Sequence, residues 1–481
     1  MKKLISLLTI ALFIPQLAFG WGLQGYVGSD GNFPHGVTFA AIYDADLDAD
    51  ISTGSPTATF AASRDATHPA TYFNSSGVMQ KTETSNVGRF NHGYYDTTGW
   101  HAFSNGAGVQ IEGASTNYIK QSIFAADGNS DGVADNWAKA DAVNVNGTPT
   151  TTLVDVSSTF NIGSTVNSQR LQYTGVAGDD ATTDISMNAV ATADGSFVQG
   201  ENVTMSGFFK GSVADGLIKI EILERNAAGG FLNAFTLSSD FSSSISTTEW
   251  RYFTLSRTTT HADCSRIIAK VWMEEIADGE SGDIQFTGVQ VEKQPFATSF
   301  IPTTTAALTR NAETLKYVTL GNRTAAVESM VVKLAPEYAN GVVGSKYIIA
   351  SDTKNRIVVF TSVAPNNDVK IFPNNTNSWE SYVGDLIDSS WTANSEMTIG
   401  CNVQSGTSPY ITGFYNGVAD GTNETTDDFT ANAWGTYMWL GSDKDGANQL
   451  NGTIQSIAFF DRVLTAAEML SLHDKDWRTL R

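Results

Sequence analysis

The stretch that decides the fold class runs from Leu217 to Leu223 and reads Leu-Ile-Lys-Ile-Glu-Ile-Leu. Its isoleucines alternate with a lysine and a glutamate, which is the two-residue period of a β-strand that buries one face. Residues 203–209 and 267–273 alternate in the same way, and turns rich in Gly, Asp and Ser separate the three segments. This pattern predicts an antiparallel β-sandwich in the middle of the chain.

A short internal repeat marks the two ends of this sandwich. Residues 108–112 read Gly-Val-Gln-Ile-Glu and recur as Gly-Val-Gln-Val-Glu at 288–292, and a Thr/Ser-rich segment follows each copy. Each copy has the pattern of a closing strand that runs into a linker. The joints therefore lie near residues 120 and 304, and they divide the chain into zones 21–120, 121–303 and 304–481.

The two outer zones differ in regularity. Zone 304–481 has further alternating segments, a hairpin turn at Asn416-Gly417, and one predicted helix over 465–473 with Thr465 as N-cap and Glu468 at the capping-box position. Zone 21–120 has many turn dipeptides and few long strands, which predicts an irregular β cap. The expected fold class is all-β, with tandem antiparallel β-sandwiches (jelly rolls) behind an irregular N-terminal β region.

Length and composition agree with several β domains. The chain has 481 residues, more than one core usually serves, and its hydrophobic fraction of 41% is sufficient for packed cores. Lys and Arg total 29 against 50 Asp and Glu, which gives a net charge of −21. Such a surface repels phosphate backbones, so no nucleic-acid partner is expected.

The N-terminus has the features of a secretory signal. Two lysines precede an apolar run over 4–14, and Ala18-Phe19-Gly20 offers small residues at a cleavage site. We expect residues 1–20 to be a signal peptide and the protein to be secreted, extracellular or periplasmic. No later segment is apolar over the ~20 residues that a bilayer requires, so no membrane span is expected.

Sequence motifs for catalysis or zinc binding are not found. The only cysteines, Cys264 and Cys401, are expected to be buried free thiols, and the six His do not cluster. The chain also lacks the ExDxxE spacing of concanavalin-like glucanases, since the acidic cluster over 274–280 breaks that pattern. We therefore expect no enzyme activity.

Segments of the first two zones resemble known families. Residues 59–64, 70–79, 89–91 and 108–117 resemble a module of bacteriophage tail and virion-associated proteins. Residues 288–303 are similar to the closing strand of the carbohydrate-binding-module-like jelly roll that commonly follows this module. A cleavable signal is unusual on a virion component, and it favours a secreted adhesin or sugar-binding protein.

The third zone resembles a laminin-G or concanavalin A-like lectin domain. The residues that carry this resemblance lie in the segments 414–417, 440–441, 451–454 and 459–469. The resemblance implies a second β-sandwich and a sugar-binding role. It is a fold signature rather than a catalytic one.

The loop from Asp127 to Asp135 has the oxygen spacing of a calcium site. Asp127, Asn129, Asp131 and Asp135 stand at positions 1, 3, 5 and 9, with a glycine at position 6. Position 12 is an alanine, so Asp283 or Glu292 would have to complete the shell, because the resemblance implies that the first and last strands are adjacent. The loop is either a calcium site, with Ca²⁺ as the cofactor, or a polar turn.

A second acidic loop precedes the turn at residues 451–452. Asp443 and Asp445, with Asn448, offer oxygens there, and they form either a second calcium site or a solvated turn.

Sugar binding requires flat aromatic rings beside amide and carboxylate groups. Trp379, Tyr382 and Trp391 follow the Asn-rich segment 374–377 and are the predicted ligand-binding residues, with core packing as the alternative. The predicted function is a secreted, non-catalytic glycan-binding or adhesion protein whose partner is a polysaccharide or cell-surface glycan. A phage-like structural or fibre protein and a polysaccharide-degrading enzyme remain the alternatives, and the sequence leaves the oligomeric state open.

Overall fold

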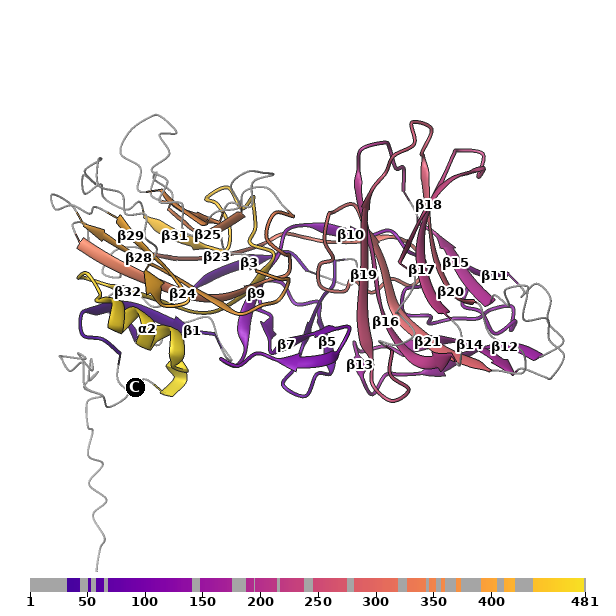
Figure 1. Cartoon of the computed structure of the whole chain (residues 1–481), viewed down its shortest axis with the longest axis horizontal. Helices are drawn as coiled ribbons and strands as arrows, with labels where there is room; N and C mark the ends of the chain where they lie inside the picture. Colours follow the sequence, from indigo (N-terminus) through magenta and orange to yellow (C-terminus); the bar gives the residue numbers. More distant parts are fainter. Residues whose placement is uncertain are drawn as a thin grey trace, which may run out of the picture.

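The computed structural model of the chain contains two β-sandwiches, one of which interrupts the other in sequence (Figure 1). We call them the split sandwich, with strands from 37–111 and 313–460, and the inserted sandwich, with strands from 137–292. The structure describes residues 33–43, 51–52, 58–64, 68–140, 148–174, 187–193, 195–213, 217–237, 245–274, 281–318, 327–342, 346–351, 356–359, 369–372, 391–404, 411–419 and 436–479. The predicted signal peptide lies outside these residues.

The inserted sandwich consists of two five-stranded antiparallel sheets. The alternation over 217–223 is confirmed, because Ile218, Ile220 and Ile222 are buried in the core between the sheets. The first sheet has the order β11 (Trp137–Ala140), β15 (Met187–Thr192), β20 (Arg266–Glu274), β17 (Leu217–Arg225) and β18 (Phe231–Leu237). The second has the order β12 (Thr148–Asp155), β14 (Asn167–Thr174), β21 (Gly282–Glu292), β16 (Asn202–Val213) and β19 (Arg251–Thr258).

The split sandwich draws strands from both ends of the chain. One sheet has the order β2 (Ile51–Ser52), β1 (Val37–Ile42), β32 (Gly452–Phe460), β24 (Val327–Pro336), β28 (Met397–Gln404), β29 (Ile411–Tyr415) and β30 (Val418–Ala419), and β9 (Gly108–Ile111) with β6 (Phe90–Asn91) extends it from β32. The facing sheet has the order β27 (Val369–Phe372), β26 (Arg356–Val359), β25 (Lys346–Ser351), β31 (Tyr437–Leu440), β23 (Glu313–Val318) and β3 (Thr59–Ala62).

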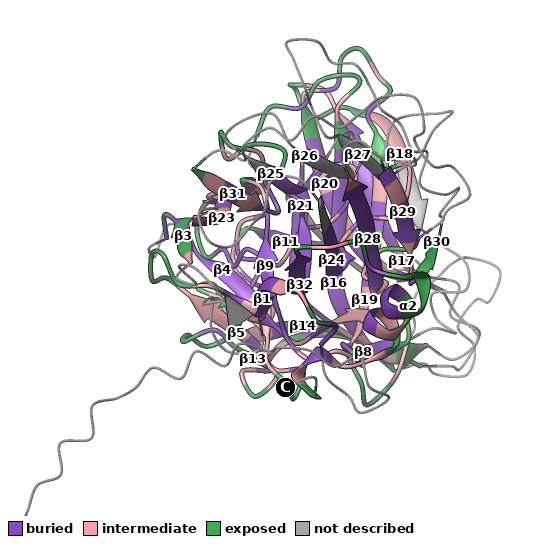
Figure 2. Cartoon of the chain, turned by 90° about the vertical axis from the view of Figure 1, so that its left-hand side faces the viewer, coloured by how far each residue is buried: buried purple, intermediate pink, exposed green. Residues whose placement is uncertain are grey.

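Strand β32 is the centre of the split sandwich. All nine of its residues are buried, and Figure 2 shows it among other buried strands. One face meets the core between the two sheets, and the other meets α2 (Ala466–Asp474) and the 3₁₀ turn η1 (Trp477–Thr479). The predicted helix and capping box are confirmed, because Thr465 accepts from the Glu468 backbone N–H and the Glu468 side chain accepts from the N-cap.

The first zone is not the separate cap that its sequence suggests, which is a correction. Strand β1 pairs with β32, with Phe39 opposite Phe459, and β3 pairs with β23. Strand β9 also pairs with β32, and Val109 is fully buried. The short strands looked irregular because their partners lie hundreds of residues away, beyond the reach of a local pattern.

Three small sheets join the two sandwiches. Strands β10 (Ser115–Asn117) and β22 (Leu308–Arg310) pair where the chain passes into and out of the inserted sandwich. Strands β4 (Ala70–Phe73) and β5 (Met79–Thr82) form a hairpin that β13 (Phe160–Asn161) extends, and β7 (Gly93–Asp96) pairs with β8 (Gly99–Ala102). Strands β4, β5, β7 and β8 of the first zone lie against the inserted sandwich.

Several local predictions are confirmed. Asn416 and Gly417 both have positive φ, at 48° and 76°, as the turn between β29 and β30 requires. Cys264 and Cys401 are buried free thiols. None of the helices in the described segments has the length and apolar character needed to cross a membrane.

The strand order predicts how fragments of the chain fold. A fragment of residues 304–481 lacks β1, β3 and β9, so the faces and edges that they cover become exposed, and we expect no cooperative thermal transition. A fragment of residues 118–304 keeps all ten strands of the inserted sandwich and should unfold cooperatively. Circular dichroism melting of both fragments beside the full chain checks this. A cooperative transition of 304–481 alone would show that the N-terminal strands are dispensable.

Candidate functional site

A pocket of about 520 Å³ lies where the two sandwiches meet, and we call it the junction pocket. Its walls come from β4, β7, β16 and β19, from the segment after β21, and from the segment that follows β24. The lining residues are Thr71, Tyr72, Phe73, Met79, Asn91, Gly93, Tyr94, Tyr95, Asp96, Thr97, Gln110, Phe208, Tyr252, Phe253, Thr254, Ser256, Pro295, Phe296, Ala297, Thr298, Ser299, Phe300, Glu337, Tyr338, Ala339, Val342, Ala393 and Asn394.

Aromatic rings connect the small sheets of the first zone to the inserted sandwich beside this pocket. Phe73 contacts Tyr95 at 5.2 Å between ring centroids, and Tyr95 contacts Phe208 at 5.6 Å. Phe208 in turn contacts Tyr252 at 4.8 Å. Tyr94, Tyr95 and Tyr252 line the pocket, and each residue as a whole is only partly buried.

Polar groups line the part of the pocket formed by the split sandwich. The Gln110 Nε2 group donates to the Glu337 carboxyl. Gln110 is 1% exposed and Tyr338 is 0% exposed, yet the Gln110 Oε1 atom and the Tyr338 hydroxyl have no hydrogen-bond partner in the described part of the chain. A buried polar atom without a partner is costly, and both of these atoms belong to residues that line the pocket.

Two carboxyl groups line the pocket, and their pKa values move in opposite directions. Burial, followed by repulsion from Glu112, raises the pKa of Glu337 well above its usual range. Partial burial acts to raise the pKa of Asp96, but hydrogen bonds from Thr98 and His101 outweigh it and lower that pKa. The same lining therefore holds one carboxyl group that loses its proton readily, Asp96, and one that retains its proton to higher pH, Glu337.

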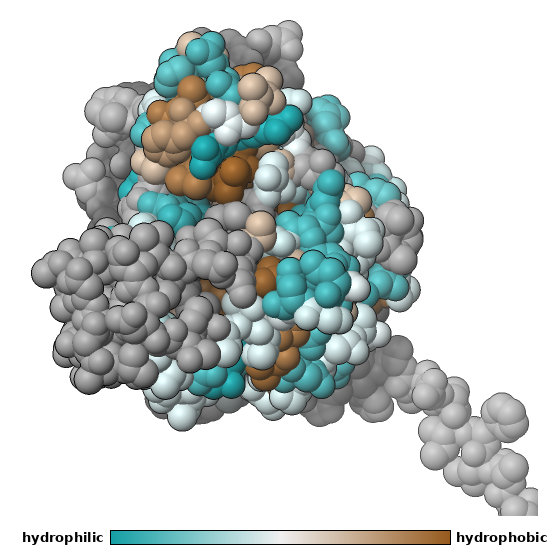
Figure 3. Space-filling view, turned by 90° about the vertical axis from the view of Figure 1, so that its right-hand side faces the viewer, coloured by the Kyte–Doolittle hydropathy of each residue, from teal (hydrophilic) through white to brown (hydrophobic). Residues whose placement is uncertain are grey.

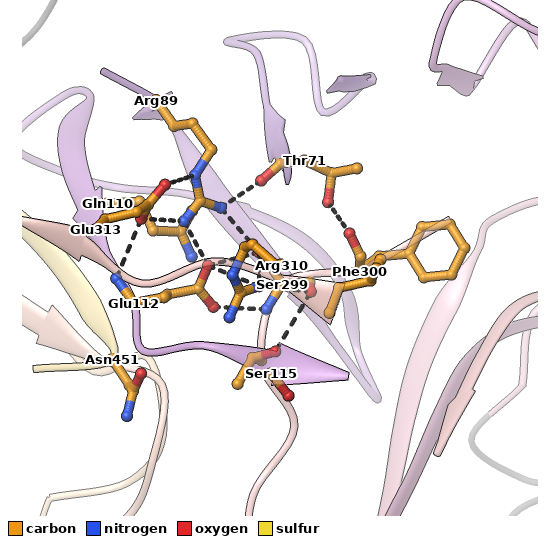
Figure 4. Close-up of polar contacts among 12 residues, drawn as sticks. Thr71, Arg89, Gln110, Glu112, Ser115, Ser299, Phe300, Arg310, Glu313 and Asn451 are labelled. Carbon is orange, nitrogen blue, oxygen red and sulfur yellow. Dashed lines mark hydrogen bonds and ion pairs between the residues drawn. The ribbon is translucent and has the colours of Figure 1, made fainter. Parts of the chain in front are cut away.

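A buried ionic network lies directly behind the pocket, and Figure 4 shows its contacts. The Arg89 guanidinium donates from Nε to Glu313 Oε1 at 2.8 Å and from Nη2 to Glu313 Oε2 at 2.5 Å. The same Nη2 donates to Glu112 at 2.5 Å, and Nη1 donates to the Thr71 carbonyl at 2.7 Å. Thr71 is itself a lining residue, so the network holds the wall of the pocket.

Two further arginines complete this network. Arg64 also pairs with Glu313, and Arg310 lies 3.1 Å from Glu112. Burial acts to raise the pKa of Glu112, but Arg310 and Arg89 outweigh it and hold the pKa well below its usual range. The Arg89, Arg310, Glu112 and Glu313 side chains are all 0% exposed, so their charges compensate one another without water.

The internal repeat supplies the two glutamates at the centre of the junction. Ser299, which follows the second copy, donates to Glu112 of the first copy through its backbone N–H at 2.7 Å and its hydroxyl at 2.6 Å. Ser115, which follows the first copy, donates to Glu292 of the second copy at 2.5 Å. The two copies thus cross-bond, and the two passages of the chain are tied side by side.

The predicted ligand-binding aromatics do not form the pocket. Trp379 and Tyr382 lie outside the described residues. Trp391 is 4% exposed, donates from Nε1 to the Tyr338 carbonyl at 3.0 Å, and belongs to the core of the split sandwich. This burial corrects the expectation that Trp391 presents its ring to a sugar. Its indole N–H instead holds the backbone of Tyr338 through this hydrogen bond.

The predicted calcium residues are not brought together as one shell. Asp127 accepts from the backbone N–H groups of Asp131 and Gly132, and Asp135 accepts from that of Gly128. Asn129 donates to Asp131 at 2.9 Å, so the loop has the bonding of a polar turn. Each carboxylate oxygen has two lone pairs, so these bonds leave acceptor capacity. Calcium binding by this loop stays a prediction.

The remaining predicted ligands lie elsewhere. Asp283 pairs with Arg170, and Glu292 lies in the junction, so neither completes the loop, which is a correction. In the second acidic loop Asp443 accepts from the backbone N–H groups of Asp445 and Ala447, and Asp445 pairs with Lys444. Across the described ranges, no group of three or more His, Cys, Asp or Glu side chains is arranged to hold a metal ion.

The sequence contained one signal for the junction, which is the repeat with its two glutamates. The pocket aromatics carried no such signal, because Tyr94 and Tyr95 lie on a short hairpin strand and Phe208 and Tyr252 lie on ordinary sandwich strands.

The chain matches no protein-family model and no curated protein. Similar solved structures include the enzymatically active domain of tailspike protein 4 of bacteriophage CBA120, with 13% identity over 36% of this chain and 21% of that chain, at a TM-score of 0.26. They also include the family 11 carbohydrate-binding module of a cellulosomal cellulase of Clostridium thermocellum, with 16% identity over 32% of this chain and 86% of that chain, at a TM-score of 0.21.

A further similar structure is a carbohydrate-binding module of the β-sandwich superfamily, with 8% identity over 53% of this chain and 85% of that chain, at a TM-score of 0.27. The match to the tailspike spans well under two thirds of that chain. All three TM-scores are low, so the fold class stated above rests on the strand pairing of this chain.

The junction network predicts a large cost for removing one charge. Glu313→Gln keeps the shape of the side chain but leaves Arg89 and Arg64 without their shared partner, so unfolding should become easier by about 3–5 kcal/mol. Glu83→Gln is the matched control, because Glu83 pairs with Lys81 at the surface, where such pairs contribute only about 0–1 kcal/mol. Urea unfolding of the full-length variants measures both, and equal midpoints for the two would contradict a stabilising role of the network.

Proposed function

We propose that the protein is secreted and binds glycans through the junction pocket without cleaving them. The observation that carries this proposal is the combination of partly exposed aromatic rings with buried polar groups that lack partners, in one pocket. Its volume of about 520 Å³ falls within the ~300–1,000 Å³ of typical ligand sites. Secretion follows from the signal expected at residues 1–20.

Sugars match the chemistry of this lining. A pyranose ring offers C–H groups on its faces and hydroxyls around its edge, so it is held by aromatic faces together with hydrogen-bonding side chains. Tyr94 and Tyr252 offer the rings, while Asn91, Gln110 and Tyr338 offer amide and hydroxyl groups. An apolar ligand would leave these polar groups unsatisfied.

The junction also favours binding by keeping the pocket in shape. Its walls belong to both sandwiches, so any rocking between them would open or close it. The network of Arg89, Glu112 and Glu313 and the crossed bonds of Ser115 and Ser299 oppose such rocking. A preformed site loses less conformational freedom on binding, which increases affinity.

One observation favours a second candidate function, a polysaccharide-degrading enzyme. Asp96 and Glu337 line the same pocket with pKa values displaced in opposite directions, as the two carboxyl groups of a glycosidase are. Release of reducing sugar from the bound polysaccharide, abolished in Glu337→Gln, would establish this candidate in place of simple binding.

Truncating one pocket aromatic tests the proposed function. Tyr94→Ala should weaken binding to the glycan selected on a microarray by about tenfold or more, because losing a contacting ring costs roughly 1–3 kcal/mol. Phe231→Ala is the matched control. Phe231 is 59% exposed on β18 and does not line the pocket. On the described surface in Figure 3, apolar residues gather near the top of this end of the molecule, and smaller groups of them lie among hydrophilic residues lower down. Equal losses in both variants would place the binding site elsewhere.

Tyr338→Phe separates binding from stability. The Tyr338 hydroxyl is buried without a partner, so its removal should leave the unfolding free energy unchanged or raise it. If the hydroxyl bonds a ligand, affinity falls by about two- to tenfold, the worth of a hydrogen bond of ~0.5–1.5 kcal/mol. Thermal melting and calorimetric titration of the same preparation measure the two effects, and a lower melting temperature would assign the hydroxyl a structural role.

A further inference from the structure

We propose that the junction pocket selects uncharged glycans and excludes anionic ones such as uronate-containing or sulfated polysaccharides. This inference rests on the proposed function and adds the class of ligand. It is carried by the charges that line the pocket and by the positions of the cations around it.

Among the residues that the structure describes, those that line the pocket carry no positive charge. None of them is a lysine, arginine or histidine, and their two ionisable carboxyl groups are Asp96 and Glu337. The rest of the lining is aromatic, aliphatic, hydroxyl or amide. The pocket is therefore neutral or negative in every protonation state of these two carboxyl groups.

The cations near the pocket are already bound by the protein. Arg89 donates to Glu112, Glu313 and the Thr71 carbonyl, and it is 0% exposed. Arg310 donates to Ser299 and to the Gly113 carbonyl, pairs with Glu112, and is also 0% exposed. Neither can turn toward a ligand without leaving a buried carboxylate uncompensated.

The His101 imidazole is also already hydrogen-bonded within the protein, although it and Asp96 are partly exposed. His101 Nε2 lies 2.9 Å from Asp96 Oδ1 and 2.7 Å from the Thr98 hydroxyl, and His101 is not a lining residue. A glycan carboxylate or sulfate in the pocket would therefore lose water without gaining a cation and would lie close to an ionised Asp96. Burying an unpaired charge beside a like charge is unfavourable.

Neutral sugars meet none of these costs. Their hydroxyls can donate to Asp96 and to the Gln110 Oε1 atom, and they can accept from the Tyr338 hydroxyl. The same groups that exclude an anion thus hold a neutral ring. The expected preference for the neutral form is on the order of tenfold to a hundredfold.

The test compares chemically matched oligosaccharides on the full-length protein. Cello-, xylo-, manno- and galacto-oligosaccharides are titrated by calorimetry, each beside a form oxidised to the carboxylate at C6 where that carbon exists. Because the whole chain carries a net charge of −21, the titrations are repeated in 1 M salt, where the Debye length is only about 3 Å. Exclusion by the pocket survives this salt, whereas repulsion by the overall charge does not.

A variant that adds a cation beside the pocket tests the inference by a gain of affinity for the oxidised oligosaccharides. Thr97 is exposed and lines the pocket beside Asp96, so Thr97→Lys should bring the affinity for the oxidised oligosaccharides within about threefold of that for the neutral ones. Thr84→Lys is the matched control, because Thr84 is also exposed but does not line the pocket, and it should keep the original preference.

The outcomes separate the two levels of the proposal. Binding of the neutral forms with a preference that persists in 1 M salt and falls in Thr97→Lys supports the inference. Equal or tighter binding of the oxidised forms overturns the inference and leaves glycan binding intact. The inference is also overturned if the preference disappears in 1 M salt or is unchanged in Thr97→Lys. Binding of neither form overturns the proposed function, and the inference with it.

Discussion

The pairing of Arg89 with Glu112 and Glu313 is the constraint that holds together the end of the split sandwich from which both passages to the inserted sandwich leave. These three side chains are fully buried, and each would cost several kcal/mol to take out of water alone. The cost is offset only when every partner is in place. Arg89 lies near β6, Glu112 follows β9, and Glu313 begins β23, so the network forms only after three distant segments have taken their positions. A shifted register would leave a buried charge unpaired, and the network therefore specifies one arrangement.

The insertion of one sandwich into the other explains why specific contacts have to fix the arrangement at the junction. A sandwich placed between β9 and β23 interrupts one hydrophobic core with another, and two passages of the chain must cross the boundary. The repeat ties the two passages together with the same pair of groups on each side. Each passage ends its strand with a glutamate, and a serine that follows donates a hydrogen bond to the glutamate of the other passage. Two crossed passages restrain rotation as well as separation, and the junction pocket keeps its walls because of this restraint.

The sequence predicted the parts of the molecule whose causes are local. The alternation over 217–223, the capping box at Thr465 and Glu468, and the hairpin at Asn416 and Gly417 each depend on neighbours within a few residues. The placement of β1 against β32 depends on a pairing across the whole chain, which no local pattern contains. The same limit applies to the site. Trp391 was a reasonable binding candidate by type and neighbourhood, but only tertiary packing determines that its ring is in the core.

The opposed pKa values at the junction determine how its stability depends on pH. Glu112 and Glu313 have lowered pKa values in the folded state, so their contribution is present above the pKa of an unfolded glutamate and is lost as pH falls through the folded values. Glu337 has a raised pKa, so its contribution is present below the unfolded pKa and is lost as pH rises through its folded value. Both contributions are fully present only near the pKa of an unfolded glutamate, so the junction is most stable close to that pH. Protonation of Glu337 also lowers the negative charge of the pocket lining, so the same titration links the stability of the junction to the charge that a molecule entering the pocket would meet.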